Sequence, residues 1–406
     1  MVRRRARPPR RSPGPARAAP GPSLRKLLGR GLRGALLAGL LPVLPALPGS
    51  APTGGAPSAP PRRPGPAPRI ERADLGTLGG EDSRATAVNG RGQVVGFSAT
   101  GSGAVHAFLW DERGGMRDLG TLGGTSSRAW AINDRGQVVG SSAVPPGRES
   151  PAAVHGFLWE AGRGMRDLGT LGGRDSHAYG IDDRGDIVGE SDVPPGRLHA
   201  IGAHAVLWRD GRVLDLGTLG GTESRALGID GRGRVVGASA LTTERRGRLV
   251  SDVVHAFLWE AGSGMHDLGT LGGRNSVARA VGAGEGGRVV GDSETRPDRL
   301  HRSTVHAFVR EAGGLRDLGT LGGAVSRARA VDAAGWIAGT SDLAAASAGA
   351  THAVLWRNGE MLDLGTLGGR DSAARGVHAP WVVGTSQTAG GRAVGVSVHA
   401  TLWTVR

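Results

Sequence analysis

The 406-residue chain contains no cysteine, which excludes disulfide bonds, thiolate metal sites and cysteine nucleophiles. Aromatic residues are also scarce, with nine Trp, five Phe and one Tyr, whereas glycine supplies 73 residues. So much backbone freedom is unfavourable for helices and is typical of many short strands joined by tight turns. Without covalent cross-links, the fold must be held together by its core alone.

Acidic residues are absent from residues 1–70, which carry fourteen Arg and Lys. The formal charge of +14 belongs to that segment alone, because residues 71–406 contain 36 basic and 36 acidic residues. A domain without net charge has no general field that collects phosphates, so nucleic acid is not expected as a partner.

No apolar run reaches the roughly 20 residues that a membrane-spanning helix needs. The longest, Gly34–Leu47, is interrupted by two prolines, follows a basic region and precedes the small residues Gly49–Ala51. This is the pattern of a secretory signal. We therefore expect residues 1–51 to direct export and the Pro-rich residues 52–69 to form a disordered spacer. The mature protein is expected to be secreted or attached to the cell surface, without an integral membrane domain.

Seven copies of DLGTLGG recur at intervals of 44 to 52 residues. They begin at Asp74, Asp118, Asp167, Asp215, Asp267, Asp317 and Asp363. A period of this length indicates a solenoid, a propeller or an array. Each repeat contains four strand-like pieces, of the types SRAxAIN, VVGxS, VHAFLW and MRDLGTL, separated by turns rich in Gly, Asn and Asp. Four strands in about 48 residues is the size of one propeller blade.

The two ends of the repeat region favour a closed ring over a solenoid. The region opens with one outer strand, Ile70–Thr77, and closes with His399–Trp403, which has no following DLG strand. Pairing of these strands would complete a seventh blade and leave no open sheet edge. A solenoid would instead need a polar capping unit at each end. We therefore predict that residues 70–406 form an all-β, seven-bladed β-propeller, closed by pairing of its N-terminal strand with the last blade.

The combination of DLGTLGG, VVGxS and HAFLW resembles the HAF family of extracellular repeats, and the resemblance covers residues 70–406. It implies an exported or surface protein with a propeller-like fold and no established common activity. Departures from the family pattern are few. Gly156 replaces the alanine of the His-Ala-Phe triplet in one repeat, and Arg310 replaces the usual tryptophan in another.

One histidine, one aspartate, one serine and usually one tryptophan recur in each repeat, as in His106, Asp118, Ser127 and Trp110. An active site needs a single constellation, so seven-fold recurrence favours a structural role. We expect a hydrogen-bonded network beneath the sheet surface, similar in residue types to that of WD-repeat propellers. No catalytic residue, metal site or cofactor is predicted from these residues.

Positions that differ between repeats are better candidates for function. They lie one and three residues after the serine of the SxAxA strand, which we expect to be innermost. The candidate binding residues are Arg128, Trp130, His177, Tyr179, Arg225, Arg327 and Arg329. Guanidinium groups and aromatic rings there would suit an anionic or carbohydrate ligand. The alternative is that the arginines pair with the acidic residues that precede the serines, which are Asp82, Asp175, Glu223 and Asp371.

These patterns predict an exported, non-catalytic binding or surface-interaction module without identifying its ligand. One alternative is a propeller enzyme, a hydrolase or lyase that acts on an extracellular glycan. The chemically distinct cluster for that role is His177 and Tyr179 with Asp175. Another alternative is a structural component of a cell wall or coat.

Overall fold

The computed structural model describes residues 68–146, 153–194, 202–245, 248–283, 287–297, 304–311, 313–344, 349–389 and 397–406. The predicted export signal and all but the last two residues of the predicted spacer lie outside these ranges. Every regular element in the described residues is a β-strand. That part of the chain contains no helix long and apolar enough to cross a membrane.

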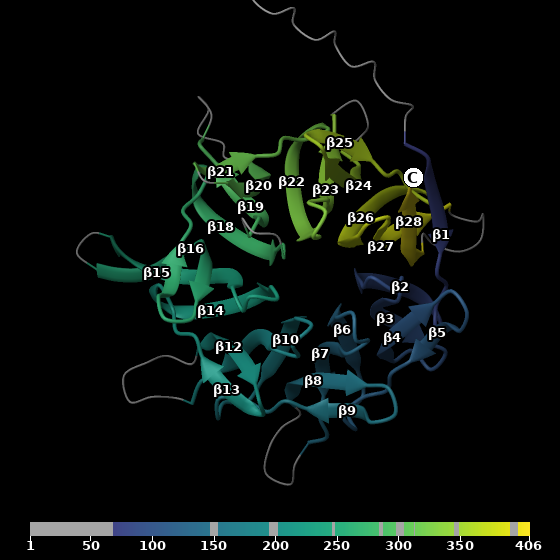
Figure 1. The fold of residues 1–406 in the computed structure, drawn as a ribbon, viewed down its shortest axis with the longest axis horizontal. Coiled ribbons are helices and arrows are strands. Elements are labelled where there is room, and N and C mark those ends of the chain that lie inside the picture. The colour runs from purple at the N-terminus through teal and green to yellow at the C-terminus, as the bar shows by residue number, and fades with distance from the viewer. Residues whose placement is uncertain are drawn as a thin grey trace, which may run out of the picture. The chain divides into compact units, whose positions relative to one another are not determined.

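The strands form four-stranded antiparallel sheets that follow one another in chain order (Figure 1). The first sheet comprises β2 (Gly79–Val88), β3 (Val94–Thr100), β4 (Val105–Asp111) and β5 (Gly115–Asp118). The second comprises β6 (Ser127–Ile132), β7 (Val138–Ala143), β8 (Val154–Glu160) and β9 (Gly164–Asp167). The third comprises β10 (Ser176–Ile181), β11 (Ile187–Asp192), β12 (Ala203–Arg209) and β13 (Arg212–Asp215), and the fourth comprises β14 (Gly220–Ile229), β15 (Val235–Arg245), β16 (Arg248–Glu260) and β17 (Gly264–Asp267).

The next eight strands belong to one sheet, but a single parallel residue pair, Val305↔Val325, joins its two halves. The first half comprises β18 (Gly272–Val281), β19 (Val289–Thr295), β20 (Val305–Glu311) and β21 (Gly314–Asp317). The second comprises β22 (Gly322–Val331), β23 (Ile337–Leu343), β24 (Thr351–Arg357) and β25 (Glu360–Asp363). Four antiparallel strands in each unit are typical of a propeller blade, so the predicted all-β, propeller-type architecture is confirmed at this level.

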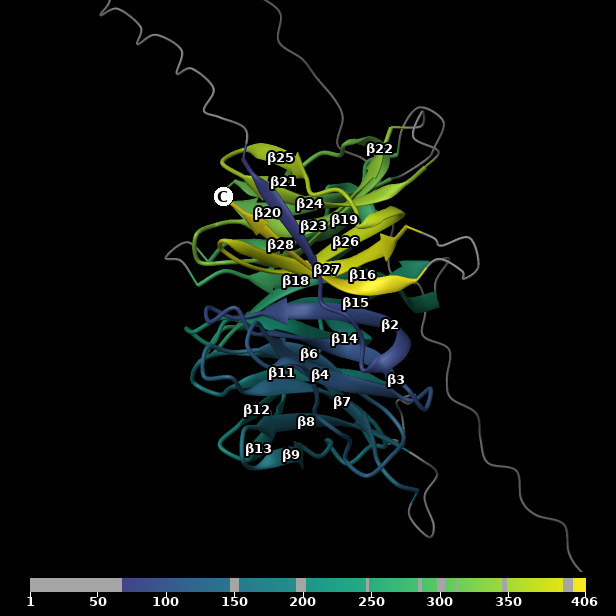
Figure 2. The ribbon, with the colours of Figure 1, turned by 90° about the vertical axis from the view of Figure 1, so that its right-hand side faces the viewer.

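The last sheet is built from both ends of the described chain. It comprises β26 (Gly368–His378), β27 (Trp381–Thr388) and β28 (Val398–Val405), with β1 (Ile70–Asp74) as its fourth strand. β1 pairs with β28 from Ile70↔Val405 to Asp74↔Thr401, and the two strands lie side by side in Figures 1 and 2. The outer edge of β28 is thus covered by the first strand of the repeat region.

Apolar side chains fill the space between successive sheets. In one cluster, Phe157 and Val138 of the second sheet pack against Val95 and Leu109 of the first. In another, Val94 and Phe108 of the first sheet pack against Val383 and Ala400 of the last. The core is therefore distributed between neighbouring sheets, including the first and the last.

Polar turns also link one sheet to the next. The side-chain amide of Asn89 donates to the backbone oxygen of Asn133 over 3.0 Å, and that of Asn133 donates to the oxygen of Asp182 over 2.9 Å. Each asparagine thus fixes the hairpin turn of the following sheet.

Candidate functional site

The seven recurring histidines each lie beside an aspartate of a DLG motif. The pairs are His106–Asp118, His155–Asp167, His204–Asp215, His255–Asp267, His306–Asp317, His352–Asp363 and His399–Asp74. His106 Nδ1 is 2.7 Å from Asp118 Oδ2, with side chains 23% and 42% exposed. The pairs therefore lie nearer the surface than the predicted buried network. His399–Asp74, at 2.6 Å, links the last strand to the first.

The recurring serine is connected to this pair through a glycine backbone. Asp118 accepts a hydrogen bond from the Gly120 N–H over 2.8 Å, and the Ser127 hydroxyl donates to the Gly120 oxygen over 2.5 Å. Ser127 also accepts from the Ala107 N–H over 2.9 Å. Ser127 is buried and thus satisfies a backbone group of β4 and one of the loop that follows β5.

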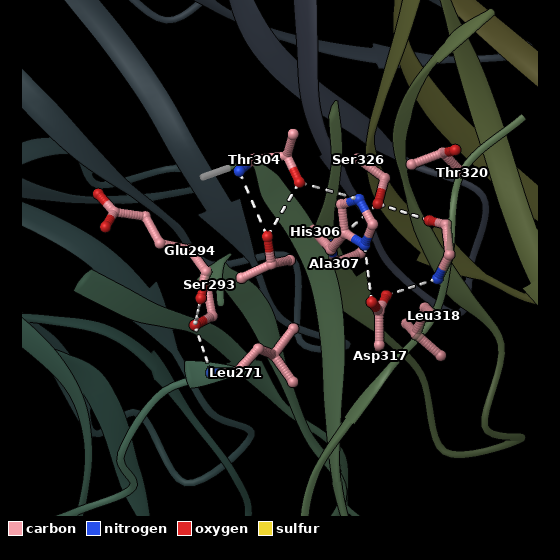
Figure 3. Close-up of polar contacts among 12 residues, drawn as sticks. Leu271, Ser293, Glu294, Thr304, His306, Ala307, Asp317, Leu318, Thr320 and Ser326 are labelled. Carbon is pink, nitrogen blue, oxygen red and sulfur yellow. Dashed lines mark hydrogen bonds and ion pairs between the residues drawn. The ribbon is translucent and has the colours of Figure 1, made fainter. Parts of the chain in front are cut away.

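Figure 3 shows the same arrangement in a later repeat, where His306 faces Asp317 and the Ser326 hydroxyl accepts from the Ala307 N–H. Trp110 makes no hydrogen bond to these residues in the part of the chain that the structure describes, whereas Trp356 Nε1 donates to the Leu318 oxygen in a later repeat. Trp110 packs instead against the apolar cluster of Val94 and Phe108.

The acidic residues that precede the serines bind backbone amides of the preceding sheet. The acceptors and donors are Asp82 with the Val398 N–H, Asp175 with the Val154 N–H, and Asp371 with the Thr351 N–H, at 2.8 to 2.9 Å. These three carboxylates make no ion pair with the candidate arginines in the part of the chain that the structure describes. For them, the alternative of arginine pairing is wrong, because each carboxylate accepts a hydrogen bond from a backbone N–H of the preceding sheet instead.

Each inner strand has a β-bulge at the third residue after its serine. In β10, for example, the pairing with β11 runs from Ala178 to Gly180 and omits Tyr179. The corresponding bulged residues are Thr86, Trp130, Tyr179, Leu227, Arg279, Arg329 and Arg375. A bulge turns a side chain away from the regular ladder and is often found next to active sites.

The glycine of the VVGxS motif permits this close packing. A Cβ atom on Gly189 would lie 1.8 Å from the backbone oxygen of His177, where no side chain can fit. The motif therefore holds the inner strand against its partner, and its variable fourth residue lies beside the bulge.

The bulged Tyr179 is held by a carboxylate on the neighbouring strand. Its hydroxyl donates to Glu190 Oε1 over 2.6 Å. Burial, reinforced by the negative charge of Glu190, raises the pKa of Tyr179 well above its usual range. The phenol therefore remains protonated and stays a hydrogen-bond donor to Glu190.

Aromatic rings from three sheets form a continuous wall beside this pair. The rings of His177 and Tyr179 are stacked, with centroids 5.9 Å apart and an angle of 10° between their planes. Trp130 lies 6.3 Å from the Tyr179 ring and 5.7 Å from Phe97. We call Phe97, Trp130, His177 and Tyr179 the aromatic wall.

Two polar contacts fix the orientation of the wall. The hydroxyl of Ser141 lies 3.0 Å from Trp130 Nε1, which donates to it, and 2.9 Å from His177 Nδ1. The Arg128 guanidinium lies 5.4 Å from the centre of the Phe97 ring. Arg128 thus makes a cation–π contact with the neighbouring sheet.

A hollow of about 110 Å³ lies where the third and fourth sheets meet. Glu190 and Glu223 line it with Arg225, and Ala203 and Ala238 form part of its apolar boundary. We call it the carboxylate hollow. Glu223 and Arg225 are exposed, so a ligand in the hollow can reach them.

The predicted site residues thus separate into two groups. Arg128, Trp130, His177, Tyr179 and Arg225 lie in or beside the aromatic wall and the carboxylate hollow. Arg327 and Arg329 lie on β22. The positive charges of Arg279 and Arg375, on the neighbouring sheets, act on Arg329. The described residues contain no cluster of three or more His, Asp or Glu side chains placed to hold a metal ion.

The sequence-based prediction missed Ser141 and Glu190 and gave Glu223 only a pairing role. A usable signal was present in the variable residue of VVGxS, which reads Phe97, Ser141, Glu190, Ala238, Asp292, Thr340 and Thr385 along the chain. It varies as the inner positions do, because both face the same region of each sheet.

Comparison with known proteins adds one relationship at the level of structure. No family model and no curated protein matches the chain. Among solved structures, a gluconolactonase from Xanthomonas campestris is similar, with 13% sequence identity and a TM-score of 0.35, over 85% of this chain and 99% of that one.

The predicted non-catalytic role is corrected by this comparison, because the similar structure is that of an enzyme. We therefore do not retain the binding-module interpretation. At this identity and TM-score the likeness carries no argument about the reaction, which has to be inferred from the site itself.

Proposed function

We propose that residues 70–406 form a closed seven-bladed β-propeller of an exported, HAF-type protein, and that this protein cleaves glycosidic bonds in an extracellular glycan. Pairing of β1 with β28 supports closure, as does the apolar cluster shared by the first and last sheets. The secretory pattern of residues 1–51 supports export.

The observation that carries the enzymatic proposal is the carboxylate hollow, where Glu190 and Glu223 face one small space. Hydrolysis of a glycosidic bond needs two carboxyl groups, one to protonate the leaving oxygen and one to act on water or on the anomeric carbon. Glutamates at these two positions of neighbouring sheets occur together once among the repeats, whereas the His–Asp pairs recur in all seven.

The surroundings of the two carboxylates favour different roles. Glu190 accepts a hydrogen bond from Tyr179, which stabilises its negative charge, so we assign Glu190 as the base. We assign Glu223, the second carboxyl group that lines the hollow, as the acid that protonates the leaving oxygen. Water adds to the anomeric carbon and gives its proton to Glu190, which yields a new reducing end and a free hydroxyl.

The aromatic wall supplies a surface on which a sugar can lie. Apolar faces of pyranose rings pack against aromatic rings, and the rings of Trp130, His177 and Tyr179 are already positioned by contacts with Ser141 and Glu190. Binding there would place a sugar next to the carboxylate hollow.

The test is to incubate the full chain with a panel of cell-wall and extracellular polysaccharides and measure new reducing ends. We expect Glu190→Gln and Glu223→Gln to lower the rate at least about 100-fold, while Glu81→Gln, at an exposed position of β2, leaves it unchanged. Products that carry an unsaturated sugar would show that the chain cleaves by elimination, as a lyase, and not by hydrolysis. Absence of cleavage across the panel would contradict the proposal.

A further inference from the structure

Three neighbouring inner strands carry an arginine at the bulge, and only the first is neutralised within its own sheet. Both Nε and a terminal nitrogen of Arg279 donate to the carboxylate of Asp292. Asp292 occupies the variable position of VVGxS and lies opposite Val277, the residue that follows Ser276 in the inner strand. This internal ion pair shows which position on the second strand a bulged arginine can reach.

The other two arginines find a neutral residue at that position. Thr340 corresponds to Asp292 in the sheet of Arg329, and Thr385 corresponds to it in the sheet of Arg375. Both threonines are buried, at 9% and 6% exposure. Among the described residues no carboxylate forms an ion pair with either arginine, and Nε of Arg375 is enclosed without a hydrogen-bond partner.

The electrostatic environment is correspondingly unfavourable for the positive charges of Arg329 and Arg375. Burial lowers the pKa of Arg329 to about 10, and the charges of Arg279, Arg375 and Arg327 contribute, against the opposing effect of Asp292. Burial also lowers the pKa of Arg375, with contributions from Arg84 and Arg279. Like charges in a partly desolvated site repel strongly, so an added negative charge would be stabilising.

We propose that Arg329 and Arg375, together with the hydroxyls of Thr340 and Thr385, bind an oxyanion carried by a sugar. Two guanidinium forks can donate paired hydrogen bonds to a carboxylate or a sulfate, and the hydroxyls can supply further donors. The substrate is therefore an acidic glycan that contains uronate or sulfate ester groups. The assignment of the substrate as a glycan rests on the proposed function, whereas the oxyanion site rests on these residues alone.

The location of the arginines supports recognition rather than a diffuse positive field. The bulge position is Thr86, Trp130, Tyr179 and Leu227 in the other four sheets, so its arginines are confined to three successive sheets. The aromatic wall lies in the first three sheets. One part of the inner surface therefore suits sugar rings, and another suits their acidic substituents.

The test measures binding of small anions to the full chain, independently of glycan cleavage. D-glucuronate and inorganic sulfate are each titrated calorimetrically and compared with glucose and with chloride at equal ionic strength. We expect binding of one or both anions, and at least about a ten-fold loss of affinity in Arg329→Gln/Arg375→Gln. The matched control is Arg117→Gln, whose guanidinium lies over the Trp159 ring away from this site. Equal affinity in the double variant, or no binding of either anion to the wild type, would overturn the proposal.

A second variant tests the same idea without removing an arginine. Thr340→Asp supplies the carboxylate that Asp292 provides to Arg279. In dilute buffer we expect it to melt at a higher temperature than the wild type and to lose anion binding. A lower melting temperature combined with undiminished anion binding would contradict the charge argument.

The two proposals fail separately. If the wild type binds glucuronate but cleaves no glycan, the oxyanion site stands and the hydrolase assignment is wrong. If the wild type cleaves neutral glycans as fast as acidic ones and binds neither anion, the hydrolase assignment stands and the oxyanion site is wrong. Glucuronate binding without sulfate binding identifies a uronate as the substrate group, and the reverse identifies a sulfate ester.

Discussion

Replacing the buried Asp182 by asparagine should stabilise the protein at neutral pH. Asp182 lies at the turn position that Asn133 occupies in the preceding repeat. Its Oδ1 accepts hydrogen bonds from the N–H groups of Arg184, Gly185 and Asp186, but its Oδ2 is enclosed and has no partner. Burial and the nearby Asp186 charge raise the pKa of Asp182.

The magnitude follows from comparison with Asn133. Its amide nitrogen donates to Gln137 Oε1 over 2.8 Å and to the backbone oxygen of Asp182 over 2.9 Å. An asparagine at 182 would keep the three accepted hydrogen bonds and direct a donor toward Asp186. Removing an unsatisfied buried oxygen typically gains about 1 to 3 kcal/mol, and weaker acceptance by an amide oxygen offsets part of this. We expect the free energy of unfolding to rise by about 1 to 2 kcal/mol.

Equilibrium unfolding in urea at pH 7 measures this change, and the pH dependence gives its sign independently. Because the folded pKa of Asp182 is raised above 3.8, the folded wild type takes up a proton as the pH falls through that folded pKa. Its stability should then approach that of Asp182→Asn, so the difference seen at pH 7 should shrink on acidification. A destabilised variant, or a difference that grows on acidification, would refute this reasoning. The reciprocal change Asn133→Asp should destabilise by about 1 to 3 kcal/mol.

Two further predictions concern the repeat network and the site. Ser127→Ala should lower the free energy of unfolding by about 2 to 3 kcal/mol in urea titrations, because the Ala107 N–H and the Gly120 oxygen lose their partner. The control Ser126→Ala should change it by less than about 0.5 kcal/mol. Equal effects of the two substitutions would contradict the role assigned to Ser127. Tyr179→Phe should lower kcat for glycan cleavage about ten-fold or more, because Glu190 loses the donor that orients it, and an unchanged kcat would remove Tyr179 from the mechanism.

The strands and their grouping could be predicted because the repeat exposes them seven times. Fixed spacings between DLG, SxAxA and VVGxS predict four strands per unit, and the structure has them. The first strand, Ile70–Asp74, pairs with the last as its isolated position in the sequence indicated. The tryptophan was less predictable. Its recurrence did not distinguish a hydrogen-bonding role from packing, and Trp110 packs against the core.

The site could be predicted only in part, because its contacts depend on register and on bulges. Arg128 and Trp130 could be recognised as variable inner residues, but their partners lie on other strands or sheets. Proximity in sequence suggested that Asp82 and Asp175 would neutralise the arginines, yet these carboxylates accept hydrogen bonds from backbone amides of the preceding sheet. The role of Glu190 became apparent only when the bulge placed Tyr179 against it.

The most direct test of the central claim is the rate at which the full chain releases reducing ends from a uronate-containing polysaccharide, compared with Glu223→Gln. We predict steady release by the wild type and a loss of at least about 100-fold in the variant, whose side chain retains its size but cannot donate the proton. Equal rates in the two proteins, or no release by either, would contradict the assignment of the carboxylate hollow as an active site.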